Sequence, residues 1–125
     1  MSNPGNLKYT KEHEWIRVEG DNAYVGITDF AQSELSEIVF VEVETIGESL
    51  KAGDVFGTVE AVKTVSELFI PVDGEVLELN PELESTPELI NDDPYGKGWL
   101  VKISIADVTQ LNELLSAEEY EAILG

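Results

Sequence analysis

The residue with the clearest capacity for chemistry is Lys63, which lies between two runs rich in β-forming residues, 55–59 and 65–70. If these runs pair as a hairpin, residues 60–64 form the reversal and Lys63 projects from the tip. A primary amine on a flexible four-carbon stem can be acylated to a stable amide, and an exposed tip gives a modifying enzyme access to it. The pattern therefore predicts an exposed lysine open to modification, although a solvated turn lysine with no further function has the same pattern.

Residue types that carry out catalysis are scarce in this chain, which has one histidine, His13, and no cysteine. Without cysteine there is no disulfide, no thiolate nucleophile and no zinc–thiolate site. One imidazole cannot form a His-rich metal site, and we find no matched nucleophile, base and oxyanion donor and no phosphate-binding glycine loop. We therefore expect His13 to be structural and the chain to be a non-catalytic component.

The charge is strongly acidic, with 7 Lys plus Arg against 26 Asp plus Glu and a formal net charge of −19. A negative field opposes approach to phosphate backbones and anionic lipid, so we expect no nucleic-acid and no membrane partner. It attracts basic protein surfaces, or it serves solubility alone. No apolar run reaches the roughly 20 residues of a membrane span, and residues 1–6 lack the pattern of an export signal. The expected location is cytoplasmic.

The elements that must position Lys63 are mainly short strands. A hairpin is expected within residues 9–27, and Asp29 with Gln32 has the spacing of a helix N-terminus, with the helix running to about Ser36. From 38 to 44 the sequence alternates, with Val39, Val41 and Val43 on one face and with Phe40, Glu42 and Glu44 on the other, solvated face. Short strands at close spacing favour a small sandwich or barrel over a parallel sheet with crossover helices.

The C-terminal third begins with an irregular stretch at 80–98 that contains three prolines and two glycines, followed by an alternating strand at 99–105. Two short helices should end the chain, because capping-box spacing occurs twice, at Asp107 with Gln110 and at Ser116 with Glu119. At 125 residues, with no linker or low-complexity segment, the chain is expected to form a single domain, 1–125.

The segment around Lys63 also resembles a known motif. Residues 60–68 and 70–76 closely resemble the lipoylation motif of the glycine cleavage system H protein family. Further segments are similar to that family in the same order, and the resemblance covers about Leu7 to Leu124; these segments are 9–15, 25–32, 39–42 and 91–99. Several separated motifs are far more specific than one lysine.

The resemblance implies a barrel-sandwich hybrid fold, mainly β with short helices, in which two small antiparallel sheets are accompanied by C-terminal helices. It implies lipoate attached covalently as an amide to Lys63. The lipoyl-lysine would receive the aminomethyl group of glycine from glycine decarboxylase (P protein) and present it to the aminomethyltransferase (T protein) for transfer to tetrahydrofolate. Dihydrolipoyl dehydrogenase (L protein) would then reoxidise it. A lipoate-attaching enzyme is the fourth expected partner.

The resemblance also assigns roles to four other residues. Glu60 and Gly74 match positions that the family uses for recognition by the lipoate-attaching enzyme, although Gly74 can equally be a turn glycine with positive φ. Glu14 and Glu67 match positions in the cleft that holds the loaded arm, where a carboxylate would pair with the aminomethyl amine. Glu67 stands where a shorter Asp is frequent, which leaves the resting position of the arm open.

Three other functions are compatible with parts of the sequence. A biotinyl carrier shares the fold, but its lysine is usually flanked by methionines, and Val62 and Thr64 stand here. An H-like paralogue that serves sulfur oxidation or relays lipoate has the same central motif. An unmodified interaction module is the alternative from a different class, and it would show no mass change after exposure to a lipoate-attaching enzyme.

Overall fold

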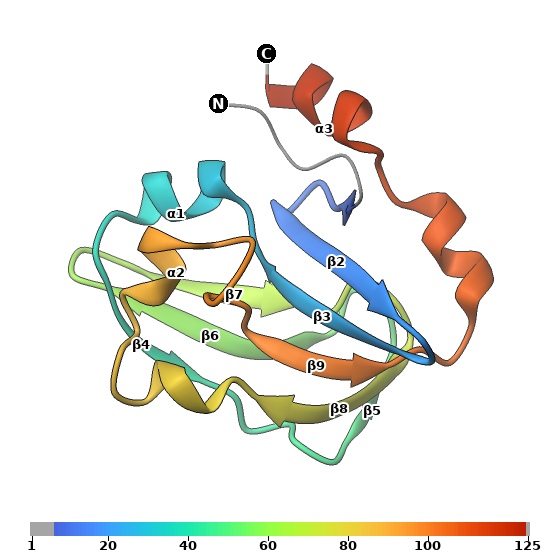
Figure 1. Ribbon diagram of the computed structural model, residues 1–125, viewed down its shortest axis with the longest axis horizontal. Coiled ribbons are helices and arrows are strands. Elements are labelled where there is room, and N and C mark those ends of the chain that lie inside the picture. Colours follow the sequence, from blue (N-terminus) through green and yellow to red (C-terminus); the bar gives the residue numbers. More distant parts are fainter. Residues whose placement is uncertain (1–6, 125) are drawn as a thin grey trace.

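The β-forming runs fold into two antiparallel sheets in the computed structural model, which describes residues 7–124 (Figure 1). The expectation about an export signal concerned residues 1–6 and lies outside the described residues. The larger sheet has the order β1 (Lys8–Tyr9), β2 (Glu14–Glu19), β3 (Asn22–Ile27), β9 (Val101–Ser104), β8 (Gly74–Leu79) and β5 (Ser49–Leu50). The smaller sheet has the order β4 (Ile38–Glu42), β6 (Val55–Ala61) and β7 (Val65–Phe69).

The core fills the space between the two sheets and closes it to water. Strands of both sheets contribute apolar side chains to this core, and in β9 these are alternate residues, as the two-residue period of a strand requires. Its fully buried members include Ile16, Val25, Phe56, Val59, Val76 and Ile103. A second cluster contains Tyr9, Trp15 and Tyr120, and the indole N–H of Trp15 donates to the carbonyl oxygens of Ile27 (3.0 Å) and Pro94 (2.9 Å). The second cluster therefore ties segments far apart in the sequence to the edge of the larger sheet.

Helical segments are short: α1 (Asp29–Leu35), η1 (Pro81–Leu83), α2 (Leu89–Asp92), η2 (Val108–Glu113) and α3 (Ala117–Leu124). The irregular stretch at 80–98 thus contains only η1 and α2, because its prolines interrupt longer elements. Two helices end the described chain, as expected. None of the helices within 7–124 has the length and apolar content needed to cross a membrane.

The predicted caps are correct at one helix and wrong in detail at two. At α3 the amide of Ser116 donates to Glu119 (2.9 Å) and the amide of Glu119 donates to the Ser116 hydroxyl (3.2 Å), which is the predicted capping box. Before η2, Asp107 accepts from the amide of Thr109 (3.0 Å), while Gln110 instead accepts from the amide of Asp73 (2.7 Å). This contact with Asp73 comes from a distant loop, so spacing alone does not reveal it.

The N-cap of α1 is Thr28 and not Asp29. The Thr28 hydroxyl accepts from the amide of Ala31 (3.2 Å), and Thr28 has the extended backbone of a cap, with φ −76° and ψ 167°. Asp29 is the first helical residue, and its carboxylate accepts from the Gln32 side chain (3.0 Å). The helix ends at Leu35 and Ser36 is its C-cap, close to the predicted end at about Ser36.

The expected alternation in β4 is broken near its start. The pairing of β4 with β6 shifts register between Ile38 and Phe40, so the prediction that Val39 shares a face with Val41 and Val43 is wrong for Val39. Ile38 and Val41 are buried, whereas Val39 and Phe40 are exposed. A bulge of this kind changes the direction of the following side chains. Phe40 lies on the outer face of the smaller sheet with Glu42, as predicted.

Candidate functional site

Lys63 lies at the tip of the hairpin formed by β6 and β7. The two strands pair from Val55 opposite Phe69 to Glu60 opposite Val65, and the amide of Ala61 donates to the carbonyl of Thr64 (2.8 Å). The reversal therefore contains residues 62–64, a narrower turn than the predicted 60–64. Lys63 is exposed, and no group within residues 7–124 forms a hydrogen bond or ion pair with its ammonium group. The amine is accessible to a second protein.

Directly below the tip, the outer face of the smaller sheet combines apolar and acidic side chains. The register places Phe40 opposite Glu60 and Glu60 opposite Val65, and residues directly opposite one another project from the same face. Phe40 is 49% exposed and Val65 is 61% exposed, so Glu60 stands between two apolar side chains in water. We call this row of Phe40, Glu60 and Val65 the tip row.

The next row on the same face contains Glu42, Thr58 and Glu67, again aligned by the pairing of β4, β6 and β7. None of these three strands contains a lysine or an arginine. The outer face therefore presents carboxylates and apolar groups without nearby strand cations to compensate the charge. Sequence reasoning identified Glu60 and Glu67, and it placed Phe40 on the same face of its strand as Glu42, which the structure confirms. The pairing of β4 with β6, which the sequence did not specify, makes Phe40 the neighbour of Glu60.

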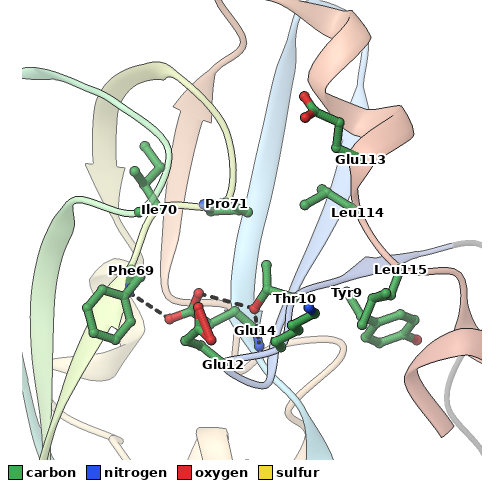
Figure 2. A pocket seen from close by; sticks show the side chains of 12 residues that line it. Tyr9, Thr10, Glu12, Glu14, Phe69, Ile70, Pro71, Glu113, Leu114 and Leu115 are labelled. Atoms are coloured by element: carbon green, nitrogen blue, oxygen red, sulfur yellow. Dashed lines mark hydrogen bonds between the residues drawn. The ribbon is translucent and has the colours of Figure 1, made fainter. Parts of the chain in front are cut away.

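Glu14 is a buried carboxyl group that joins the two sheets. It is 2% exposed, and its Oε2 accepts a hydrogen bond from the amide of Phe69 on β7 (2.6 Å). The Thr10 hydroxyl lies 3.5 Å from Oε1 and accepts from the Glu14 amide at 3.2 Å (Figure 2). Burial raises the pKa of Glu14 to about 8; nearby Glu12 acts in the same direction, while the hydrogen bonds from Phe69 and Thr10 act against it. In this structure Glu14 therefore favours its neutral form at pH 7.

Two cavities meet at Glu14. The first, of about 150 Å³, lies between α1, the β6–β7 hairpin and the loop before β2, and its acidic lining residues are Glu12, Glu14, Glu34 and Glu67. Its apolar lining residues are Ile27, Phe30, Ala31, Leu35, Val59 and Leu68. We call it the acidic cleft. The second, of about 240 Å³, lies on the side of Ile70 and Leu114 and is shown in Figure 2. The structure thus brings Glu14 and Glu67 to one cleft.

The composition of the acidic cleft suits a hydrocarbon arm that ends in a cation, because apolar walls favour the chain and carboxylates favour the charge. Ser66 also lines the cleft and lies three residues after Lys63 on the same hairpin, about 10 Å along an extended strand. An arm attached to Lys63 and a cleft on the same hairpin are geometrically compatible. Across residues 7–124, no group of three or more potential ligands gathers to hold a metal ion.

His13 lines the acidic cleft but is engaged in the fold. Its Nδ1 lies 2.8 Å from the Tyr120 hydroxyl, which is also hydrogen-bonded to Thr28 (2.7 Å), and its ring packs against Phe30 at 4.7 Å between centroids. Burial lowers the pKa of His13, while nearby acidic residues act against this effect. His13 has a positive φ of 68°, so the surrounding contacts hold it in an unfavourable backbone conformation. These contacts agree with the structural role that we expected.

Gly74 lies apart from the other site residues. It begins β8 opposite Leu50, beyond the base of the hairpin, where the amide of Ile70 donates to the carbonyl of Asp54. The distance from Ile70 to the tip along β7 is roughly 20 Å. Gly74 does not have the positive φ of a turn glycine; instead, a Cβ at this position would collide with the carbonyl oxygen of Ser104. The turn interpretation is therefore wrong, and close backbone approach is the structural requirement.

A small sandwich of two antiparallel sheets that presents a lysine on an exposed hairpin is the barrel-sandwich hybrid fold of lipoyl and biotinyl carriers, which defines the class of this protein. The model of the family described as "Glycine cleavage H-protein" matches residues 7–125. The chain belongs to the glycine cleavage H-protein family.

Individual relatives agree along the full length. The glycine cleavage system H protein of Bacteroides thetaiotaomicron is 60% identical over 125 residues, which are 100% of this chain and 99% of the relative. That of Bacteroides fragilis is 61% identical with the same coverage. The crystal structure of a glycine cleavage system H protein from Mycobacterium marinum superposes with a TM-score of 0.85 at 38% identity, covering 98% of this chain and 99% of that chain. None of these matches supports a biotinyl carrier or an unmodified module.

Proposed function

We propose that this chain is the lipoyl-carrying shuttle of the glycine cleavage system, with lipoate attached as an amide to Lys63 and with the P, T and L proteins as its successive partners. The observation that carries the proposal is the free ammonium group of Lys63 at the tip of the β6–β7 hairpin, above an acidic and apolar face. Family membership supplies the system in which such a carrier acts.

When attached, the lipoyl group supplies a disulfide that takes up the one-carbon unit of glycine and two electrons. The protein's own residues tether, shelter and present this group. Lys63 provides an attachment point that a partner active site can enclose, and the carrier contributes to rate only through proximity.

Glu14 and Glu67 are proposed to shelter the cationic end of the loaded arm in the acidic cleft. Because burial holds Glu14 neutral up to about pH 8, pairing with an ammonium group requires that Glu14 release its proton. Pairing should therefore strengthen as pH rises toward 8. Glu67 is exposed and lies at the mouth of the same cleft, where it adds negative charge.

The tip row is proposed as the contact for the lipoate-attaching enzyme, with Glu60 pairing with a basic residue of that enzyme and Phe40 and Val65 excluding water around the pair. The net charge of −19 favours basic partner surfaces in general. The assignment of Gly74 to enzyme recognition stays a prediction, as does the cytoplasmic location.

Lys63→Arg is the direct test, because arginine keeps the charge but cannot form the same amide. The variant should fold normally, gain no lipoyl mass with a lipoate-attaching enzyme, and fail to support glycine–bicarbonate exchange with the P protein. Lys97→Arg, which changes another exposed turn lysine, is the matched control and should remain active. Exchange activity in the Lys63→Arg variant would contradict the proposal. Lipoylated wild-type protein that supports no exchange would instead favour the H-like paralogue.

A further inference from the structure

Asn91, in α2, has an unexplained set of contacts close to the hairpin. Its Nδ2 donates to the carbonyl of Ser36 (2.7 Å) and to the side-chain oxygen of Gln32 (2.9 Å), while its Oδ1 accepts from the amide of Ile38 (3.0 Å). One amide side chain thus uses both donors and its acceptor. It joins α2 to the end of α1 and to the start of β4.

The contact with Ser36 supports a strained residue. Ser36 has φ 67° and ψ −142°, a backbone conformation that glycine adopts readily and other residues rarely do. Its amide donates to the carbonyl of Gln32 (2.9 Å), and its carbonyl accepts from Asn91. A non-glycine residue keeps such a conformation only when its surroundings hold it there. Asn91 supplies one of these two restraints.

Glu37 lies between Ser36 and Ile38, the two residues whose backbone Asn91 contacts. The carbonyl of Glu37 accepts from the amide of Val62 (3.0 Å). Val62 immediately precedes Lys63. The bond between Ala61 and Thr64 closes the turn within the hairpin, but the bond from Val62 to Glu37 fixes the turn against the body of the protein. Asn91 therefore holds the backbone on both sides of Glu37, the residue to which the neighbour of the proposed attachment site is hydrogen-bonded.

We propose that Asn91 is a positioning residue that orients the Lys63 tip for acylation by holding the Ser36–Ile38 segment on which Val62 is anchored. This inference rests on the proposed function. If the anchor is lost, the tip samples other orientations, and the attaching enzyme encounters the competent one for a smaller fraction of the time. The apparent affinity of the enzyme for the carrier is reduced in proportion to the fraction of carrier molecules in the competent orientation, while the chemical step is unaffected. The expected signature is a higher KM with an unchanged kcat.

Asn80 offers a matched control. It also makes three side-chain hydrogen bonds, donating from Nδ2 to the carbonyls of Lys97 (2.8 Å) and Trp99 (2.9 Å) and accepting from the amide of Glu82 (3.1 Å). None of these partners belongs to the hairpin or to the α1–β4 connection. Substitution of Asn80 therefore tests the effect of losing three side-chain hydrogen bonds elsewhere in the protein, while the contacts that hold the Ser36–Ile38 segment stay in place.

The first experiment measures hydrogen exchange of the Val62 amide in the unmodified protein. Asn91→Ala should accelerate this exchange about tenfold relative to wild type, after correction for global stability, whereas Asn80→Ala should leave it within about twofold. Equal acceleration in both variants, or none in Asn91→Ala, overturns the inference. If Asn91→Ala does not fold, Asn91→Asp keeps the size and the acceptor for Ile38 and removes the donors to Ser36 and Gln32.

The second experiment measures lipoylation kinetics with a purified attaching enzyme. Asn91→Ala should raise KM about tenfold with kcat within about twofold, and adding Ser36→Gly should recover most of the loss, because glycine adopts the conformation without support. A change confined to kcat, or no recovery with Ser36→Gly, overturns the inference. Wild-type protein that is never acylated contradicts the proposed function instead, and the Val62 exchange then still decides whether Asn91 anchors the tip.

Discussion

Glu14→Gln provides a quantitative test of the buried carboxyl group that joins the sheets. Glutamine has nearly the same shape as a protonated glutamate, so its side-chain oxygen can still accept from the amide of Phe69. It cannot ionise, which removes the cost of a buried charge. The comparison of the two proteins across pH therefore isolates the titration of Glu14.

The direction in which stability changes with pH follows from the raised pKa of Glu14. The unfolded chain releases this proton near pH 4.5, the ordinary pKa of a glutamate, whereas the folded protein keeps it until about pH 8. Between these values the folded state binds more protons, so the stability from Glu14 is fully present below pH 4.5 and is lost as pH rises to about 8. At 1.36 kcal/mol per pH unit the loss is about 5 kcal/mol at pH 8 and about 3 kcal/mol at pH 7.

The assay is urea unfolding of both proteins at constant ionic strength, in steps from pH 5 to pH 8.5. The free energy of unfolding of Glu14→Gln, minus that of wild type, should rise by up to about 1.4 kcal/mol per pH unit and level off above pH 8. Three other carboxylates have lowered pKa values, and the stability that they contribute is lost as pH falls: Asp73, Asp107 and Glu119. Both proteins contain them, so their contributions cancel in the difference.

Glu67→Gln, which removes an exposed carboxylate from the same cleft, is the control for the loss of one negative charge. A flat difference curve for Glu14→Gln, or a difference that falls with pH, would refute the reasoning, because it would mean that the folded protein keeps Glu14 ionised.

Three further predictions concern other parts of the molecule. Gly74→Ala should lower the free energy of unfolding by about 2 kcal/mol or more, because its Cβ meets the Ser104 carbonyl oxygen; an unchanged urea midpoint would contradict this. Phe40→Ser should raise KM for lipoylation about fivefold with little change in stability, whereas Val18→Ser, at the similarly exposed Val18 (43%) on the larger sheet, should leave KM unchanged. Affinity for the P protein, measured by calorimetry, should weaken as salt rises, and salt-independent binding would limit the charge of −19 to solubility.

Features that depend on neighbours in the sequence were predictable. The hairpin around Lys63 follows from two β-forming runs at close spacing, and the capping box of Ser116 and Glu119 follows from residues three apart. The helix after residue 28 was also predicted, but its cap was not. Thr28 and Asp29 are both good capping residues, and Thr28 takes the position while its hydroxyl also contacts Tyr120, 92 residues later.

The features of the site likewise divide into those that the sequence predicts and those that only the tertiary structure decides. Composition, the motif around Lys63 and the exposed turn were determined by the sequence, because a free amine at a bend requires only local structure. The burial of Glu14, the pairing of Phe40 with Glu60 and the anchor at Asn91 were decided by tertiary structure. In the sequence Glu14 is one glutamate among many; only its burial in the folded protein, where it accepts from the distant Phe69, removes its water and raises its pKa. Desolvation depends on which distant segments surround a group, and no spacing along the chain specifies this.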